Sequence, residues 1–441
     1  MDEPAAGIPG DVGPDGARIG VAMNKPSSTY RSDPTDRSDR SDEKNRLLGS
    51  PLPARGEGSA ELDESHWLLP VYSPHTPVEP VRGEGAIVYT RDGRALIDFY
   101  GGHAVALLGY GHPRLVAALA NQAKELFFQS NSVALSLRAR AAERLVRFGP
   151  EGLTRAFLVN SGAEANENAL RLAFRHTKRT RIVALEGAFH GRTAAAAAIT
   201  WKSERWYGFP RPPFDVTFVP RGDLGALEAA LGADVAALIL EPVQGQAGAV
   251  ALGAPYIAAA RELTEASGAL LIFDEVQCGM GRTGHPFAAQ AYGVTPDLLT
   301  TAKGLAGGFP AGAVLVSDAV AAGLKYGDLG STFGGGPMAC ALIETVIETI
   351  ESEGLMERVR ALSASIRETC QVGPVRSIQG DGFLLGLRTS RPAKEIVKEL
   401  LEKGILSGTS GDPDVVRLLP PLILEESHVE TLAKALAEIR P

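Results

Sequence analysis

The sequence predicts an α/β fold in which a mostly parallel sheet is wound between helices. Short apolar runs of four to six residues recur from residue 156 onward, and segments with helical spacing of apolar positions lie between several of them. Strands buried on both faces are nearly continuous in apolar residues, as these runs are. A change of composition near Met338 predicts that the N- and C-terminal segments form a second, smaller α+β domain.

The composition limits the classes of function. The chain has 441 residues, enough for two domains with a large core, and a formal net charge of -8. This acidic balance argues against nucleic acid or an anionic membrane surface as the main partner. The three cysteines are too few and too scattered for a disulfide framework or a metal cluster. No apolar run reaches the roughly 18 residues of a membrane span, and no signal pattern opens the chain, so we expect a cytoplasmic protein.

The chain divides into four expected parts. Residues 1–60 are rich in Gly, Pro, Asp, Ser and Arg and are expected to be a disordered tail. Residues 61–110 should join the small domain, and they contain a hairpin pattern around Asp92-Gly93. Residues 111–335 are expected to form the large domain. Residues 336–441 should form the C-terminal small domain, with a long helical region broken at Gly354, short strands near 375, 382–388 and 415–419, and a last helix over 426–439.

Seven apolar runs are the candidate strands of the large domain. Helical patterns precede or separate them at 112–128, 161–178 and 253–268. The runs begin at Ala156, Arg181, Asp215, Ala236, Leu270, Leu298 and Gly312.

Two of these runs end in residues that carry chemistry. The run from Leu270 ends at Asp274, and the run from Leu298 is closed by Lys303. In open α/β sheets the ligand site lies at the carboxyl ends of the strands, so we expect both side chains in one site. Pyridoxal 5'-phosphate (PLP) needs this pair, because a lysine carries it as a Schiff base and an aspartate keeps its pyridine nitrogen protonated.

The segment that follows the first strand is a candidate phosphate cradle. Ser161, Gly162 and Ala163 are small residues at the predicted start of a helix, where free backbone N–H groups bind anions. A structural alternative is an N-cap at Ser161 with a capping box completed by Glu164. Both interpretations can hold together.

Three further segments supply candidates for the ring and the substrate. Phe189 could stack on a cofactor ring beside His190, or both could be ordinary core and loop residues. Arg192 could clamp a substrate carboxylate, or form a surface ion pair. Glu241 ends an apolar strand and either caps the next turn or faces the site. Gln277 could donate to the phenolic oxygen of the ring.

A Gly-rich loop precedes the long helical region. Ser331 and Thr332 in this loop could add hydroxyl groups to a phosphate, or the loop could be a flexible linker. We interpret Cys278 as a packing residue, because no set of protein ligands for a metal can be assembled around it.

Together the motifs NSGAEANE, FHGRT, EPVQG, FDEVQCGMGRTG, TTAKGLAGG and GSTFGG resemble those of a class III aminotransferase, a PLP enzyme of fold type I. The resemblance covers about 67–441. It implies a homodimer with active sites at the subunit interface. It also implies Lys303 as the residue that carries PLP, Asp274 on the pyridine nitrogen and Phe189 on the ring face, with Thr332 reaching the phosphate of the neighbouring subunit.

Within the class, YGGHAVALLGYGHP and VVRLLPPLIL resemble acetylornithine and succinylornithine aminotransferases. The resemblance implies that Arg192 binds the substrate α-carboxylate and that Arg417 lies near the same pocket, with His103 on the substrate side. Gln246 stands where related ornithine enzymes have a glutamate that pairs with the arginine at the Arg417 position.

The resulting hypothesis is a transfer of an ω-amino group from an acylated diamino acid, such as N-acetylornithine, to 2-oxoglutarate, as in arginine or lysine biosynthesis. Two enzymatic alternatives stay open: a sister transaminase acting on ornithine, 4-aminobutyrate or a carrier-linked lysine precursor, and a PLP aminomutase of the same fold. A third alternative, a non-catalytic homologue, is disfavoured by the intact Lys303, Asp274 and Phe189.

Overall fold

The computed structural model describes residues 67–69, 71, 78–205 and 207–441. Residues 1–73 and 74–441 form separate units, and the fold below is that of the second. In the first unit, the described side chains of Trp67, Leu68, Leu69 and Val71 are exposed. The tail predicted over residues 1–60 lies outside the described residues.

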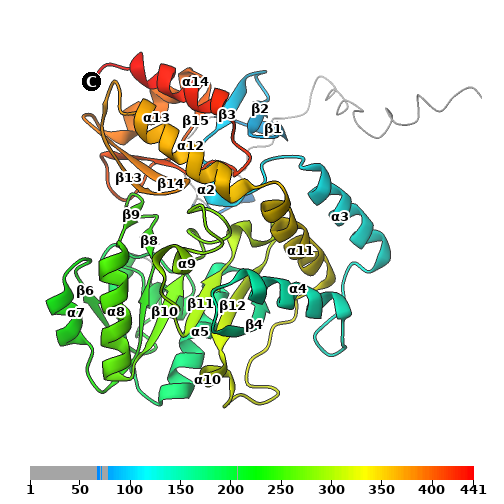
Figure 1. Cartoon of the computed structure of the whole chain (residues 1–441), viewed down its shortest axis with the longest axis vertical. Helices are drawn as coiled ribbons and strands as arrows, with labels where there is room; N and C mark the ends of the chain where they lie inside the picture. The colour runs from blue at the N-terminus through cyan, green and yellow to red at the C-terminus, as the bar shows by residue number, and fades with distance from the viewer. Residues whose placement is uncertain (1–66, 70, 72–77, 206) are drawn as a thin grey trace, which may run out of the picture. The chain divides into compact units, whose positions relative to one another are not determined.

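A seven-stranded sheet organises residues 153–317 (Figure 1). Its strand order is β4-β12-β11-β10-β7-β5-β6, and only β12 runs antiparallel to its neighbours in this sheet. Each of the seven apolar runs became one of these strands, so the predicted α/β class is confirmed. The strands are β4 (Leu153–Val159), β5 (Arg181–Leu185), β6 (Asp215–Val219), β7 (Val235–Leu240), β10 (Leu270–Asp274), β11 (Leu298–Thr301) and β12 (Gly312–Ser317).

Helices cover both faces of this sheet, which explains why its inner strands are almost wholly apolar. Successive side chains of a strand point to opposite faces. In β7, Ala237 and Ile239 pack in the cluster that contains α5 (Gly162–Thr177). Leu238 and Leu240 pack in the cluster that contains α4 (Ser136–Phe148) and α8 (Ala254–Ser267).

Shorter elements connect the strands and helices of this region. They are α6 (Ala194–Ala198), η1 (Ser203–Arg205), α7 (Leu224–Ala230), β8 (Val243–Gln244), β9 (Val250–Ala251), α9 (Ala288–Tyr292), η2 (Lys303–Ala306) and α10 (Asp318–Ala321).

Two smaller sheets are built from the two ends of the second unit. β2 (Ile87–Thr90) and β3 (Ala95–Asp98) form the predicted hairpin, and β1 (Pro80–Glu84) extends it. On the other side, β15 (Ile405–Leu406) pairs in parallel with β3, so an early and a late segment share one sheet. The other sheet contains β13 (Val375–Asp381), β14 (Leu384–Thr389) and β16 (Val415–Leu418) in antiparallel order.

The remaining helices are α2 (Gly101–Ala104), α3 (Pro113–Glu125), α11 (Pro337–Ser352), α12 (Leu355–Thr369), α13 (Ala393–Glu402) and α14 (Glu426–Ala437). The predicted break at Gly354 separates α11 from α12, and this glycine has a left-handed φ of 61°. Such a conformation favours glycine, because it has no Cβ.

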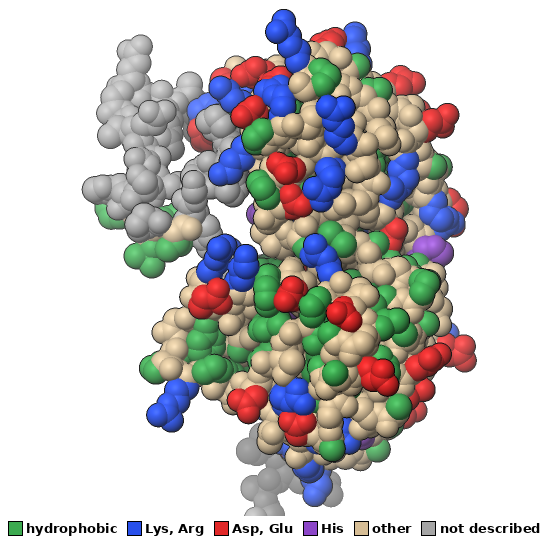
Figure 2. Space-filling view, turned by 90° about the vertical axis from the view of Figure 1, so that its left-hand side faces the viewer, with side chains coloured by type: hydrophobic (Ala, Val, Ile, Leu, Met, Phe, Trp, Pro, Cys, Tyr) green, Lys and Arg blue, Asp and Glu red, His purple; other side chains and the backbone are tan. Residues whose placement is uncertain are grey.

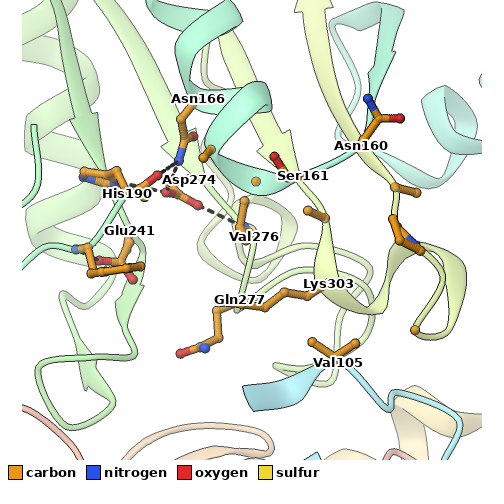
Figure 3. A pocket seen from close by; sticks show the side chains of 18 of the residues that line it. Val105, Asn160, Ser161, Asn166, His190, Glu241, Asp274, Val276, Gln277 and Lys303 are labelled. Atoms are coloured by element: carbon orange, nitrogen blue, oxygen red, sulfur yellow. Dashed lines mark hydrogen bonds and ion pairs between the residues drawn. The ribbon is translucent and has the colours of Figure 1, made fainter. Parts of the chain in front are cut away.

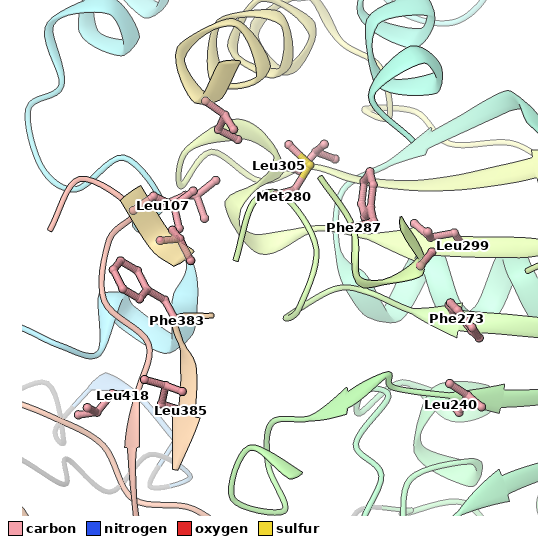
Figure 4. Packing of buried hydrophobic residues seen from close by; sticks show 14 of the residues in the cluster. Leu107, Leu240, Phe273, Met280, Phe287, Leu299, Leu305, Phe383, Leu385 and Leu418 are labelled. Atoms are coloured by element: carbon pink, nitrogen blue, oxygen red, sulfur yellow. The ribbon is translucent and has the colours of Figure 1, made fainter. Parts of the chain in front are cut away.

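One apolar cluster continues from the large sheet into the small antiparallel sheet (Figure 4). Phe273 and Leu299 of the large sheet, Leu305 after β11, and Leu385 and Leu418 of the small sheet all belong to it. A shared core of this kind fixes the loops that lie between the two sheets. These are the loops at the carboxyl ends of the parallel strands.

The surface is mixed in charge. On the face shown in Figure 2, basic and acidic side chains are interspersed. None of the helices within the described residues has the length and apolar character needed to cross a bilayer.

Candidate active site

A cavity of about 320 Å³ opens at the carboxyl ends of the parallel strands (Figure 3). This volume lies at the lower end of the range of small-molecule sites. The residues that line it come from the loops after β4, β5, β7, β10 and β11, from the end of β10, from α5 and from the residue that follows α2: Val105, Asn160, Ser161, Gly162, Ala163, Asn166, Phe189, His190, Gly191, Glu241, Asp274, Val276, Gln277, Ala302, Lys303, Gly308, Phe309, Pro310 and Ala311.

Asp274 is a buried carboxylate that three neighbours hold in place. Its Oδ2 accepts hydrogen bonds from Asn166 Nδ2 and His190 Nδ1, each at 2.7 Å. Its Oδ1 accepts from the backbone N–H of Val276 at 3.0 Å. These contacts fix the orientation of the carboxylate at the cavity wall.

Lys303 lies two residues after the end of β11 and faces the same cavity as Asp274. Its backbone is left-handed, with φ of 48°. Such strain in a non-glycine residue is a feature of functional sites. Burial lowers the pKa of the Lys303 amine, and the nearby carboxylates of Asp274 and Glu241 oppose this shift. The predicted pairing of one acid and one lysine from two strand ends is therefore present in the geometry.

The N-terminus of α5 forms another wall of the cavity. Ser161 is the N-cap, and its Oγ accepts from Glu164 N at 3.2 Å. The Glu164 carboxylate bonds the backbone N–H of Asn160 at 2.6 Å, one residue earlier than in a standard capping box. Gly162 and Ala163 occupy the first turn, where helical N–H groups have no partner within the helix. The cap is therefore present, and the anion cradle beside it stays a prediction.

Phe189 and His190 follow β5 and both line the cavity. Phe189 is partly exposed, whereas His190 is buried against Asp274. His190 is therefore a neighbour of the acid rather than an isolated loop histidine. Arg192 is exposed, outside the cavity lining, with its Cζ 5.9 Å from the centre of the Phe189 ring.

Glu241 both lines the cavity and organises its loops. Its Oε1 accepts from Phe189 N at 2.8 Å, and its Oε2 from Gly245 N at 3.3 Å. Burial raises the pKa of this carboxyl to about 7. Gln277 lies close to Gly245, because a Cβ at residue 245 would be 1.6 Å from Gln277 Oε1. A side chain at residue 245 would therefore displace the Gln277 amide from its present position.

Arg417 is buried but lies outside the cavity lining. Its Nε donates to the carbonyl of Thr409 at 2.7 Å and its Nη1 to that of Gly245 at 3.3 Å. Gln246 is exposed. The contacts that hold the Arg417 guanidinium thus include main-chain carbonyl groups.

Tyr100 connects Arg417 with His103. The Arg417 Cζ lies 5.9 Å from the centre of the Tyr100 ring. The Tyr100 hydroxyl lies 2.5 Å from His103 Nδ1. His103 itself is exposed and left-handed, with φ of 64°, and only Val105 of this turn reaches the cavity lining.

The predicted Gly-rich loop is placed at the edge of the site. Ser331 Oγ accepts from Asn160 Nδ2 at 3.3 Å and so contacts the cavity lining indirectly. Thr332 is exposed and does not line this cavity. A role for Thr332 toward a neighbouring subunit stays a prediction.

Sequence reasoning missed two buried polar residues of the site. Asn166 on α5 bonds Asp274 directly, and Thr300 on β11 bonds Asn166 at 2.7 Å. A signal was present for Asn166, because an amide on the buried face of an apolar helix needs a partner. Thr300 gave no such signal, since threonine is common in strands.

The residues fit PLP. The first turn of α5 can receive a phosphate, an oriented carboxylate can hold a ring nitrogen, and a lysine amine faces the same cavity. Among the described residues there is no group of three or more His, Cys, Asp or Glu side chains that could hold a metal ion.

Comparisons with known proteins agree with this geometry. The family model described as "Aminotransferase class-III" matches residues 69–439. The acetylornithine aminotransferase of Streptomyces clavuligerus is 44% identical over 362 residues, which are 81% of this chain and 89% of the relative. That of Methanocaldococcus jannaschii is 39% identical over 388 residues, 85% of this chain and 96% of the relative.

Solved structures give the same result. The ornithine aminotransferase of Toxoplasma gondii ME49 is 30% identical, with a TM-score of 0.79 over 85% of this chain and 92% of that one. The acetylornithine aminotransferase of Elizabethkingia anophelis is 30% identical, with a TM-score of 0.75 over 84% and 96%. The chain therefore belongs to the class III aminotransferases, and it is a PLP-dependent enzyme.

Proposed function

We propose that this aminotransferase moves the δ-amino group of an N2-acylated ornithine, with N-acetylornithine as the first candidate, to 2-oxoglutarate. The products are the corresponding semialdehyde and glutamate, and the reaction would belong to arginine biosynthesis in the cytoplasm. The observation that carries the proposal is the cavity shared by Asp274 and Lys303, with two arginines close to its lining. Relatives at 39–44% identity that bear the name acetylornithine aminotransferase support the choice of donor.

Lys303 is the proposed acid and base. When bound, PLP supplies a carbonyl carbon that accepts an amino group and a ring that withdraws electrons. Burial lowers the pKa of the Lys303 amine, so a larger fraction of it is neutral near neutral pH. A neutral Nζ can take the proton from the substrate carbon that bears the transferred amine. It can then deliver this proton to the carbon of the cofactor that accepted the amino group. Asp274 keeps the ring nitrogen protonated.

The cavity walls would orient the cofactor. Phe189 would cover one face of the ring, while the first turn of α5 would hold the phosphate through Gly162 and Ala163. Gln277 is the proposed partner of the ring hydroxyl, and its place on the cavity wall supports this role. His190 would act through Asp274, which it contacts at 2.7 Å.

Arg192 and Arg417 are the proposed carboxylate clamps. An arginine binds a carboxylate through two parallel hydrogen bonds, which gives both affinity and orientation. Arg192 lies near the Phe189 ring, and Arg417 is bonded to the carbonyl of Gly245, next to Gln277. The amino donor and 2-oxoglutarate both carry carboxylates, so the two arginines could bind a substrate in each half of the reaction.

We also propose a homodimer. No residue of α3 is buried in the single chain, although the helix carries Val116 and Leu119, and both are exposed. Phe127, Phe128 and Phe333 are also exposed, and the last two rings lie 5.3 Å apart. A second copy would cover these side chains, as expected for apolar patches of this kind. Thr332, adjacent to Phe333, would then be available to the partner.

A panel of amino donors tests the proposed substrate. Purified enzyme would receive 2-oxoglutarate with N-acetylornithine, N-succinylornithine, ornithine, 4-aminobutyrate or a lysine derivative, and glutamate formation would be measured. We expect the highest kcat/KM with an N2-acylated ornithine. A preference for ornithine would instead favour a sister enzyme, and the ornithine aminotransferases among the similar structures make this the second candidate. Turnover without any keto acid would favour an aminomutase.

A further inference from the structure

Four buried polar side chains form a continuous set of hydrogen bonds beneath the cavity. Thr300 Oγ1 donates to Asn166 Oδ1 at 2.7 Å, and Asn166 Nδ2 donates to Asp274 Oδ2 at 2.7 Å. His190 Nδ1 contacts the same Asp274 oxygen, also at 2.7 Å. All four residues are at most 3% exposed. Most buried polar groups in proteins are hydrogen-bonded, and here each link depends on the next.

The amide of Asn166 has a single workable orientation. Its Nδ2 carries two protons, and they are used by Asp274 Oδ2 and by the backbone carbonyl of His190, which lies at 2.8 Å. If the amide were turned over, its oxygen would face both the carboxylate and this carbonyl, which accept but cannot donate. The donors of Asn166 therefore fix both the Asp274 carboxylate and the turn that carries His190.

Thr300 holds this amide from the other side. Thr300 and Asp274 are register partners on the parallel strands β11 and β10, and Asn166 approaches from α5. The Thr300 hydroxyl occupies the amide oxygen and so keeps the nitrogen aimed at Asp274. The next residue, Thr301, is equally buried, but its hydroxyl has no hydrogen-bond partner.

We propose that Asn166 and Thr300 are positioning residues that orient the Asp274 carboxylate toward the ring nitrogen of PLP. The proposal rests on the assignment of Asp274 to that nitrogen. Neither residue transfers a proton to the substrate. Asn166 donates to Asp274 Oδ2, and Thr300 keeps the amide in the orientation that this bond needs, so that the carboxylate stays in place.

The positioning of Asp274 can be distinguished from a general effect on folding with a PLP analogue in which a C–H group replaces the ring nitrogen. Such an analogue, 1-deazapyridoxal 5'-phosphate, keeps the aldehyde and phosphate but cannot engage Asp274 through a ring N–H. Dissociation constants of PLP and of this analogue would be measured on the apoenzyme by fluorescence titration. The variants are Asn166→Ala, Thr300→Val and the matched control Thr301→Val, which removes an unpartnered hydroxyl from the same strand.

We expect Asn166→Ala to bind PLP about tenfold to a hundredfold more weakly, since it removes a hydrogen bond to a charged group. Thr300→Val should lose about threefold to tenfold, because it removes a bond between neutral groups. Binding of the analogue should change much less in both, and Thr301→Val should match the wild type for both ligands.

Equal losses for the two ligands would overturn the proposal, because they would reveal a purely structural role. So would a Thr300→Val variant that behaves like Thr301→Val while Asn166→Ala binds PLP normally. If Asn166→Ala does not fold, the comparison of PLP and analogue binding between Thr300→Val and Thr301→Val still tests the proposal. A wild-type enzyme that binds PLP and the analogue equally well would instead overturn the assignment of Asp274, and an enzyme that transfers no amine from any donor would overturn only the proposed function.

Discussion

Glu241 and Phe189 are joined by a hydrogen bond of 2.8 Å from the backbone N–H of Phe189 to Glu241 Oε1. The second carboxylate oxygen accepts from the backbone N–H of Gly245 at 3.3 Å. The Glu241 side chain thus accepts hydrogen bonds from two turns, one after β5 and one after β7. The first turn presents the proposed stacking ring, and the carbonyl of the second accepts from Arg417. Glu241 therefore links the cofactor side of the cavity to the substrate side.

The first prediction concerns this carboxylate. Glu241→Ala removes the acceptor of both turns, so we expect PLP affinity to fall about tenfold, the effect of two lost hydrogen bonds at about 0.5–1.5 kcal/mol each. Glu241→Gln keeps one oxygen for Phe189 and should lose less. Cofactor titration of the apoenzyme measures both changes. Unchanged affinity in the alanine variant would show that the Phe189 turn does not need this anchor.

The second prediction concerns Lys303. Lys303→Ala should lower kcat by at least about 10²–10⁴-fold, the usual contribution of a positioned acid or base. Added methylamine should restore part of the activity, because a small amine can occupy the space of the missing Nζ. The exposed Lys325 provides the control variant Lys325→Ala. Turnover of Lys303→Ala at the wild-type rate would refute the assignment.

The third prediction separates substrate binding from cofactor binding. Arg192→Ala should raise the KM of the carboxylate substrates about tenfold or more, since charge-assisted hydrogen bonds are lost, with little change in PLP affinity. Arg192→Lys keeps the charge but not the planar pair of donors, so it should recover only part of the loss. Steady-state kinetics and cofactor titration measure the two effects. Equal losses in both would contradict the clamp.

The fourth prediction tests the homodimer. Phe333→Glu places a charge in an exposed aromatic patch with Phe128 and should shift the protein toward monomers in sedimentation velocity. PLP affinity should fall with it if Thr332 of the partner subunit contributes to the phosphate site. Leu224→Glu, an equally charged change at an exposed apolar residue of α7, serves as the control. Dimers that persist in Phe333→Glu would place the interface elsewhere.

Much of the fold followed from the sequence. The five inner strands of the large sheet are almost wholly buried, so their apolar runs stood out without any knowledge of pairing, whereas the edge strands β4 and β6 are partly exposed. Three elements gave weaker signals: α4 carries many arginines, α13 is short, and β15 has only two residues. The pairing of β15 with β3 joins residues more than 300 positions apart, and no local pattern reports such a contact.

The site was predictable where a residue type is unusual for its place. An aspartate or a lysine at the end of an apolar strand attracts notice, which led to Asp274 and Lys303. Asn166 gave only a general signal, an amide on the buried face of a helix, and Thr300 gave none, so only the three-dimensional contacts reveal their connection to Asp274. The partners of Arg417 were not predictable either. Its guanidinium is held by the carbonyl groups of Thr409 and Gly245, and no local sequence pattern indicates that Gly245 lies close to Arg417.

The fifth prediction concerns Glu275, which follows Asp274 but does not line the cavity. Its carboxylate accepts the backbone N–H groups of Ala288 at 2.6 Å and Ala289 at 2.8 Å, at the start of α9. Burial nevertheless raises the pKa of this carboxyl from 4.5 to about 7. The unfolded chain therefore releases the proton near pH 4.5, whereas the folded chain keeps it to about pH 7.

The contribution of Glu275 to stability is accordingly complete below pH 4.5 and declines as the pH rises to about 7. Glu275→Gln carries no titratable proton, so its stability should lack this component. Between pH 4.5 and 8 the wild type should lose up to about 3 kcal/mol relative to the variant, from 1.36 kcal/mol per pKa unit. Melting temperatures of both proteins, taken at equal protein concentration across this range, measure the difference. Parallel curves would mean that Glu275 is ionised throughout, because the two N–H donors of α9 would then outweigh the cost of burying the charge.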